Sequence, residues 1–261
     1  MAVSRFLIDS HVHIYPFHDL EWALNALFDR LSRPGVIAVA CLTERFDCDL
    51  FYEISEDESK LQDSSFSISQ RPGPRCLLIE SSKHNGRMYL IAGQQIVTGE
   101  NLEILGLNIA ERIPDSLSAG ETIDRVLRAG GTPVVAWGFG KWLFSRSRIV
   151  RALLEQFDPC QLVLGDTSMR PIGWLTPLLF RVARRKGFRI LHGSDPLPHS
   201  GEEKQAGSYC SDVIADTEDP QKLIEMFLLD PAVHIKSFGR RGLPWQVARR
   251  LLSHSRNQAS G

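Results

Sequence analysis

Two histidines, two residues apart, stand at the end of the first apolar run of the chain. The run at residues 5–8 is followed by Asp9, His11 and His13, with Ser10 and Val12 between them. In an extended strand, side chains alternate between two faces, so Asp9, His11 and His13 are expected to point the same way. Neighbouring imidazoles at the end of a buried strand form half of a site for a divalent metal ion. The carboxylate of Asp9 can support one of these ligands.

A second polar pair, Ser194-Asp195, follows an apolar run at residues 188–192 late in the chain. If both runs are strands of one sheet, their ends meet at the same edge, and Asp195 can complete the half-site of His11 and His13. The alternative interpretation is a half-buried strand that carries two histidines and binds no metal.

The composition is typical of a globular protein. Of the 261 residues, 43% are hydrophobic and 23% are charged, and the formal net charge is -1. A chain of this length can bury a large core, and we expect one domain over residues 1–256 and a polar tail at 257–261. Because no global basic field attracts polyanions, we expect no nucleic-acid partner.

Cysteine usage and apolar stretches bear on location. The five cysteines are scattered and form no Cys-x-x-Cys motif, a pattern typical of reduced thiols in a cytoplasmic protein. Arg5 and Asp9 interrupt the only apolar run near the N-terminus, so we expect no signal peptide. No stretch approaches the ~20 apolar residues that a membrane span requires, so we expect no membrane partner. These features predict a cytoplasmic protein.

Predicted strands and helices alternate along much of the sequence. Helical periodicity with capping and breaking residues predicts helices at 19–31, 51–61, 118–130, 148–157, 175–185, 219–229 and 243–253. Apolar runs predict strands after the first one at 36–42, 75–80, 88–97, 102–109, 132–136, 161–164 and 188–192. The Ser-, Pro- and Gly-rich residues 64–74 predict a loop. Residues 194–209 predict either a substrate-binding loop or a long structural connection.

This alternation predicts an α/β protein with a single-domain, TIM-like (β/α) barrel. A doubly wound open sheet is the alternative, but no Gly-x-Gly-x-x-Gly follows the first strand. In such barrels the active site lies at the carboxyl ends of the strands. Those ends carry His11, His13, Glu44, Gln95, Glu103, Trp137, Asp166 and Asp195.

The order of these motifs resembles the polymerase and histidinol phosphatase (PHP) family over nearly the whole chain. Residues 9–13 resemble its opening Asp-x-His-x-His, and residues 193–195 its closing Gly-Ser-Asp-x-His. Residues 102–106 resemble its His-Ile-Leu-Gly strand, and residues 129–138 its Ala-Gly-Gly…Ala-His-Pro segment. The resemblance implies a distorted seven-stranded (β/α) barrel that binds zinc, manganese or iron and hydrolyses phosphoesters. The amidohydrolase superfamily also opens with His-x-His and closes with Asp.

Several positions depart from the PHP pattern. Thr43-Glu44 stands in place of Asp-His, Gln95 in place of a Glu that bridges metals, and Glu103 and Trp137 each in place of a His. His199 lies several residues beyond the place of the closing His. The sequence therefore predicts a reduced site with one divalent ion.

In this reduced site, His11, His13 and Asp195 are expected to bind the metal, with Glu44 or water as a fourth ligand. Zinc and manganese both suit such ligands, and iron is a further choice. Glu103 and Asp166 are candidate proton acceptors in catalysis. Lys141 and Arg170 are candidate binding residues for an anionic substrate.

Three functions remain open at this stage. The first is a metal-dependent hydrolase of PHP type that acts on a small anionic phosphoester through an activated water. The second is an amidohydrolase-like enzyme that cleaves a C–N or ester bond. The third is a non-catalytic barrel with a decayed metal site, which binds a ligand or partner.

Overall fold

The first strand lies inside the sheet rather than at its edge. In this computed structural model, which describes residues 3–62, 64–229 and 233–259, β1 (Ser4–Val12) pairs parallel with β2 (Val36–Glu44) and antiparallel with β10 (Tyr209–Ala215). Its residues from Phe6 onward are buried, because the strand has neighbours on both sides and packed layers on both faces.

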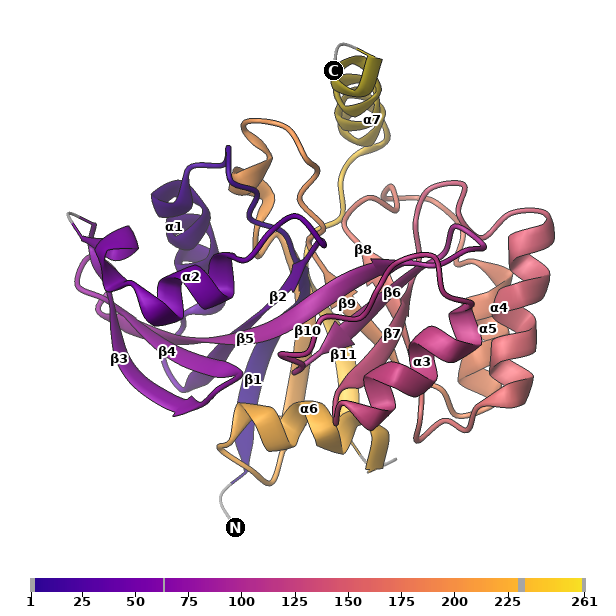
Figure 1. Ribbon diagram of the computed structural model, residues 1–261, viewed down its shortest axis with the longest axis horizontal. Coiled ribbons are helices and arrows are strands. Elements are labelled where there is room, and N and C mark those ends of the chain that lie inside the picture. The colour runs from indigo at the N-terminus through magenta and orange to yellow at the C-terminus, as the bar shows by residue number, and fades with distance from the viewer. Residues whose placement is uncertain (1–2, 63, 230–232, 260–261) are drawn as a thin grey trace.

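The sheet has eleven strands and curls into a nearly closed barrel (Figure 1). The order is β11-β10-β1-β2-β5-β6-β7-β8-β9, and β3 and β4 extend it beside β5. At the seam, β9 lies against β1, and the Ser10 hydroxyl donates to His192 O at 3.0 Å. The remaining strands are β3 (Phe66–Gly73), β4 (Cys76–Ser81), β5 (Gly86–Val97), β6 (Glu103–Leu107), β7 (Thr132–Ala136), β8 (Val163–Thr167), β9 (Ile190–Gly193) and β11 (His234–Gly239).

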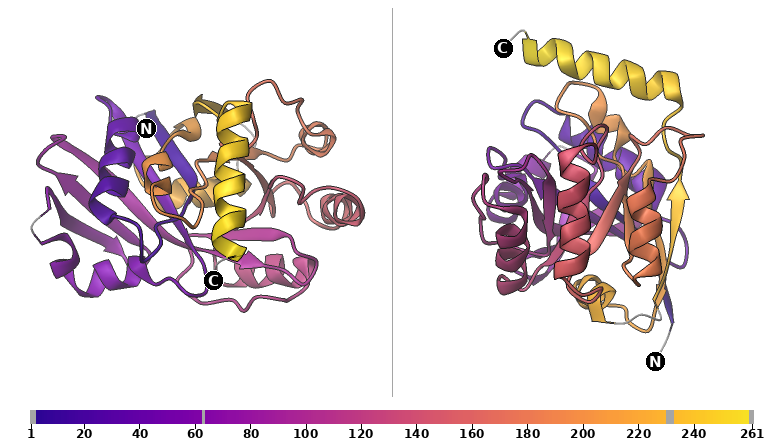
Figure 2. Two further views of the ribbon diagram at one scale, coloured as in Figure 1. Left: turned by 90° about the horizontal axis from the view of Figure 1, so that it is seen from above. Right: turned by 90° about the vertical axis from the view of Figure 1, so that its right-hand side faces the viewer.

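Seven α-helices are described, and most of them cover the outside of the barrel (Figures 1 and 2). Two helices are exceptions. α7 lies across the end of the barrel where β1 and β2 finish. α6 lies at the opposite end, and its Leu223 and Ile224 join the apolar cluster inside the barrel. Among the described residues, no helix combines the length and the apolarity needed to cross a bilayer. The helices are α1 (Leu20–Leu31), α2 (Leu50–Glu56), α3 (Ala119–Arg128), α4 (Ser145–Gln156), α5 (Leu178–Arg185), α6 (Pro220–Leu229) and α7 (Pro244–Ala259), with short 3-10 turns η1 (Glu58–Leu61) and η2 (Glu202–Gln205).

The apolar side chains form an inner and an outer core, and strand alternation decides which one each residue joins. Phe6 and Ile8 of β1 belong to the inner cluster, whereas Leu7 packs with α1. In β2, Val39 and Cys41 point inward. A third cluster packs beneath α3, α4 and α5. Where a strand has no bulge, the side of the sheet on which a polar residue lies can therefore be read from its apolar neighbours in the same strand. In β1 the register shifts between Asp9 and Val12, so the residues after the shift do not follow the parity of Leu7.

The predicted α/β barrel is confirmed, with more strands than expected. The β5–β6 and β6–β7 pairs are antiparallel, as is the pairing of β10 with β1 and β11, so the sheet is mixed. The predicted loop at 64–74 is wrong. Most of it is β3, which pairs with β4 alone and contains register shifts. An edge strand of this kind tolerates Ser and Pro, because half of its backbone groups face water.

Two further strands, β10 and β11, were not predicted. The last predicted helix, at 243–253, is longer than expected, because α7 continues to Ala259 into the expected polar tail at 257–261. Residues 260–261 of that tail lie outside the described residues.

Candidate metal centre

His11 at the end of β1 and His13 just after it face each other inside the barrel. His11 and His13 are buried, and their Nε2 atoms lie 3.0 Å apart. The amide oxygen of Gln95, from β5, lies 2.9 Å from Nε2 of His11 and 3.2 Å from Nε2 of His13. Strand alternation therefore brings both imidazoles to one side, as expected.

Asp195 reaches this pair from the segment after β9. Its Oδ1 lies 3.6 Å from Nε2 of His11 and 3.9 Å from Nε2 of His13. Its backbone N–H donates to His11 O at 2.8 Å. Its φ of +52° is left-handed, a conformation that costs a non-glycine residue about 1 kcal/mol. The close approach of β9 to β1 depends on Gly193, because a Cβ at that position would clash with Cβ of His11.

These three side chains, called here the His–His–Asp cluster, have the spacing that one divalent ion requires. Their ligand atoms all lie within 4.8 Å of one another. Two ligands bound at about 2.0 Å in a tetrahedron are about 3.3 Å apart. The separations of 3.0, 3.6 and 3.9 Å are close to that value. The residues present therefore fit a single metal ion.

The surroundings favour the protonation states that bind metal. Burial, and then the neighbouring His11, lower the pKa of His13 to about 3, so its imidazole is neutral near pH 7. Burial acts to raise the pKa of Asp195, but His11, His13 and Arg250 outweigh this effect and lower it. Neutral imidazoles and ionised carboxylates are the forms that act as ligands.

Asp9 does not share the expected role. The pairing of β1 with β2 shifts register between Asp9 and Val12, and such a bulge redirects the side chains beside it. The Asp9 carboxylate accepts hydrogen bonds from the backbone N–H of Ser194 at 2.9 Å and of Gly207 at 2.8 Å. Asp9 therefore holds the segment that carries Asp195 rather than orienting an imidazole.

A cavity of about 290 Å³ opens beside the His–His–Asp cluster, and its lining includes His13, Gln95 and Asp195. Glu103 and Lys141 lie in the same cavity and form an ion pair. The sequence predicted Glu103 as a proton acceptor and Lys141 as an anion-binding residue. Arg45 and Tyr15 also line this cavity, although neither had been predicted as a site residue. The signal for Arg45 is its place directly after β2.

Glu44 is not brought to this cluster. Its carboxylate accepts the backbone N–H of Phe51 at 3.0 Å, at the start of α2, and lies 3.7 Å from Arg112. Burial raises the pKa of Glu44 to about 7, and the N–H of Phe51 and the charge of Arg112 oppose this effect. The physical reason is that side chains along β2 alternate between the inside and the outside of the barrel. Residue 44 shares parity with Leu42, which packs outward, so its side chain lies outside the barrel.

Gln95 occupies the place next to the imidazoles that had been expected for Glu44. It shares parity with Ile91 of β5, which belongs to the inner cluster. This alternation can be read from the sequence. It identifies Gln95 as an inward-facing residue whose amide oxygen is available as a metal ligand. Its neutral amide oxygen is a hard ligand atom of the kind that suits manganese.

Asp166 and Arg170 are brought together with each other rather than with the cluster. Nε of Arg170 donates to Asp166 at 2.7 Å, and the hydroxyl of Tyr209 donates to the same carboxylate at 3.1 Å. Asp166 shares parity with Leu164, which packs beneath α5, so it points away from the barrel interior. Asp166, the predicted proton acceptor, and Arg170, the predicted anion-binding residue, therefore neutralise each other's charge in the barrel wall.

Two other histidines also lie apart from the cluster. His192 was expected to face away from it, and its Nδ1 lies 3.3 Å from the hydroxyl of Ser211 on the outer side. His199 lies 3.8 Å from Glu202, and its carbonyl contacts His18.

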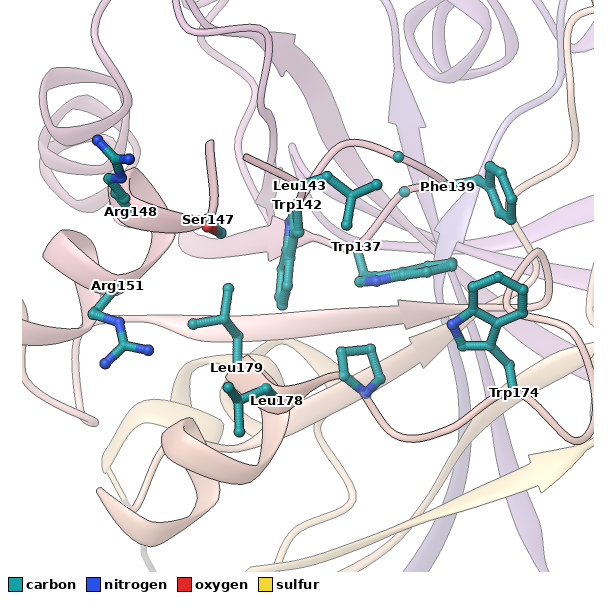
Figure 3. Close-up of a pocket in the computed structure, with 13 residues that line it drawn as sticks. Trp137, Phe139, Trp142, Leu143, Ser147, Arg148, Arg151, Trp174, Leu178 and Leu179 are labelled. Carbon is teal, nitrogen blue, oxygen red and sulfur yellow. The ribbon is translucent and has the colours of Figure 1, made fainter. Parts of the chain in front are cut away.

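A larger apolar pocket of about 500 Å³ adjoins the metal centre. We call it the aromatic pocket. Figure 3 shows Trp137, Phe139 and Trp174 at one end of it, with Trp142 and Leu179 deeper in. Phe139 also lines the smaller cavity beside the cluster. The aromatic pocket and the cavity beside the cluster therefore share Phe139 as a common wall.

Comparison with known proteins finds likeness at the level of the fold alone. No protein-family model matches the chain, and a search of curated proteins finds no significant match. Among solved structures, PsfC from Pseudomonas syringae PB-5123 is similar with a TM-score of 0.58 at 13% identity, over 98% of this chain and 99% of that chain. The lesion-specific endonuclease PfuEndoQ from Pyrococcus furiosus gives a TM-score of 0.50 at 12% identity.

This match with PfuEndoQ covers 91% of the present chain and 59% of the endonuclease. An endonuclease Q complex with a 27-mer duplex containing an abasic lesion is similar with a TM-score of 0.48 at 12% identity, over 89% of this chain and 58% of that chain.

The expectation that the protein has no nucleic-acid partner is corrected by this comparison. PfuEndoQ, which shares the fold, is a lesion-specific endonuclease. The expectation rested on the formal net charge of -1. A sum over the whole chain does not describe how charge is distributed on the surface, and local distribution is what a polyanion meets.

Proposed function

We propose that the protein is a metal-dependent hydrolase that acts on phosphoesters. The observation that supports this most is the His–His–Asp cluster, whose donors are spaced for one divalent ion beside a cavity. The order of motifs that resembles the PHP family points to the same class of reaction. The fold shared with PfuEndoQ agrees with it.

Each residue of the cavity has a distinct task in this proposal. His11, His13 and Asp195 hold the ion, and Gln95 lies ready as a further oxygen donor. A divalent ion in such a site supplies Lewis acidity, which lowers the pKa of water to about 7 and polarises a phosphoryl oxygen. Asp9 keeps the segment of Asp195 in register through its hydrogen bonds to Ser194 and Gly207.

Substrate binding and proton transfer fall to the other charged residues of the cavity. Arg45 and Lys141 offer positive charge to an anionic substrate. Glu103 faces the same space and accepts a proton from the attacking water. Its ion pair with Lys141 fixes the orientation of its carboxylate before substrate arrives. The aromatic pocket next to this cavity takes the apolar part of the substrate.

The first test is the metal content of the purified protein after loading with zinc or manganese, measured by mass spectrometry. We expect one equivalent in the wild type and none in a His11→Ala/His13→Ala variant. His84→Ala is the matched control, because His84 lies at a turn far along the chain and should leave the metal content unchanged. Absence of metal from the loaded wild type would refute the proposal and favour a non-catalytic barrel.

The second test separates chemistry from metal binding. Glu103→Gln should keep the metal and lose most of the turnover of a chromogenic phosphodiester. General-base catalysis contributes about 100-fold or more. Hydrolysis of amides or lactones in place of phosphoesters by the loaded wild type would favour the amidohydrolase alternative.

A further inference from the structure

A second polar cavity, of about 480 Å³, lies between α1, the segment after β11 and the first turns of α7. Five arginines line it, and we call it the arginine cavity. They come from α1 and the turn after it, from the segment after β11, and from α7. They are Arg30, Arg33, Arg240, Arg241 and Arg250.

The charges of these arginines are largely unbalanced. No carboxylate occurs among the described residues that line the cavity. Among the described residues, Arg250 is the only lining arginine that forms an ion pair, and its partner is Glu202. Since the formal net charge of the chain is -1, this concentration of positive charge is a local feature.

Neutral backbone oxygens serve three of the other guanidinium groups. Arg30 donates to Lys204 O at 2.6 Å, Arg33 to Arg30 O at 3.3 Å, and Arg241 to Pro171 O at 3.4 Å. These bonds orient the side chains without cancelling their charge. The Arg240 side chain has no hydrogen bond or ion pair within the described residues and is exposed.

Phosphate is the anion that suits such a cluster of guanidinium groups. Its oxygens accept hydrogen bonds from guanidinium N–H groups, often two at a time, so a phosphate would balance the positive charge of the arginines.

We propose that the arginine cavity binds a chain of adjacent phosphate groups, as found in a nucleic-acid strand or a nucleoside polyphosphate. Arg250 is already paired with Glu202, but the other four guanidinium groups still exceed what one phosphate can occupy, since each can bind a phosphate through two parallel hydrogen bonds. Arg250 also donates to Asp195 O at 3.1 Å, so the cavity adjoins the backbone of the metal centre. The arginine cavity is separate from the proposed hydrolytic centre. Phosphate binding in it is therefore measured without an assay of hydrolysis.

The experiment measures binding by fluorescence anisotropy, with a labelled single-stranded 12-mer of deoxythymidine and with unlabelled tripolyphosphate as competitor. If the four arginines without an ion pair meet phosphates, the logarithm of the affinity should fall against the logarithm of salt with a slope of about -2.8. Arg240→Gln should reduce this slope by about 0.7 and weaken binding several-fold.

The control is Arg148→Gln on α4, since Arg148 is likewise exposed and has no described ion pair. Tight binding of the 12-mer alone identifies a nucleic-acid strand as the source of the phosphates, and competition by tripolyphosphate identifies a small polyphosphate. Both support the proposal. Binding should persist in His11→Ala/His13→Ala, which keeps the result independent of the metal centre. Absence of binding to either probe, or equal losses in Arg240→Gln and Arg148→Gln, would overturn it.

Discussion

Arg250 is the principal polar tie between α7 and the barrel. Its Nε lies 2.9 Å from both oxygens of Glu202, and its Nη1 and Nη2 donate to Ser168 Oγ at 3.0 Å and to Asp195 O at 3.1 Å. The side chains of Arg250 and Glu202 are 10% and 5% exposed. Most of the helix is exposed, and Val247 is its well-buried apolar anchor.

Replacing Arg250 with Met keeps the length of the side chain and removes its charge. Breaking a buried ion pair by removing one partner costs about 3–5 kcal/mol, because the other charge is left uncompensated. Here Glu202 can regain water only if α7 moves away. We therefore expect the cost to appear as local opening of α7, with an opening equilibrium about 100-fold higher for about 3 kcal/mol.

Hydrogen exchange of backbone amides measures this opening directly. The amides of α7 should exchange about 100-fold faster in Arg250→Met, while those of β1 keep their protection. Arg249→Met is the matched control, since Arg249 is the exposed neighbour on the same helix. Unchanged exchange in α7 would show that Arg250 does not hold the helix. Equal acceleration in β1 would show that the ion pair stabilises the whole fold instead of one end.

Three further predictions concern pH and the aromatic pocket. Glu44→Gln should stabilise the protein above pH 7 by up to about 3 kcal/mol, because burial first of all raises the pKa of Glu44 to about 7. This cost is absent below pH 4.5, the ordinary pKa of the group, and grows as pH rises through 7, so denaturant titrations at pH 4.5 and 8 should differ. His192→Asn should flatten the loss of stability on acidification, because burial lowers the pKa of His192 to about 4 and the wild type loses stability as pH falls from 6.5 toward 4. An equal loss of stability on acidification in the wild type and the variant would contradict this. Trp174→Ala should weaken binding of an anionic naphthalene dye about fivefold, the worth of one aromatic contact, whereas the exposed Trp245→Ala should not change it.

Strand alternation explains how far the sequence could predict the candidate site. It correctly placed His11 and His13 together, because His11 lies at the end of β1 and His13 follows directly after the strand. The polar residues at the ends of the other strands were grouped by position alone. Had their parity been compared with the apolar residues beside them, Gln95 and Glu103 would have been assigned to the interior, and Glu44 and Asp166 to the outside.

The fold was predictable where single segments carry a strong pattern. The helix at α1 shows the expected stripe of buried residues and begins after Asp19, whose side chain accepts the Trp22 N–H at 2.9 Å. The hairpin from β4 to β5 has its Asn-Gly turn. The strand β11 was missed because it is an exposed edge strand, and β10 because Ser211 and Asp212 interrupt its apolar residues, although most of the strand is buried. Their pairing depends on β1, far away in sequence.

The buried carboxylate of Asp9 has a consequence for how the protein is made. Its partners Ser194 and Gly207 lie 185 and 198 residues further along the chain, and β1 also pairs with β10. Contacts of such high sequence separation slow folding, because the loop between them must close first. While the ribosome is still synthesising the middle of the barrel, the first strand has an open edge and an acid without its donors. The His–His–Asp cluster therefore forms late in biosynthesis, only after the chain has been synthesised past Asp195.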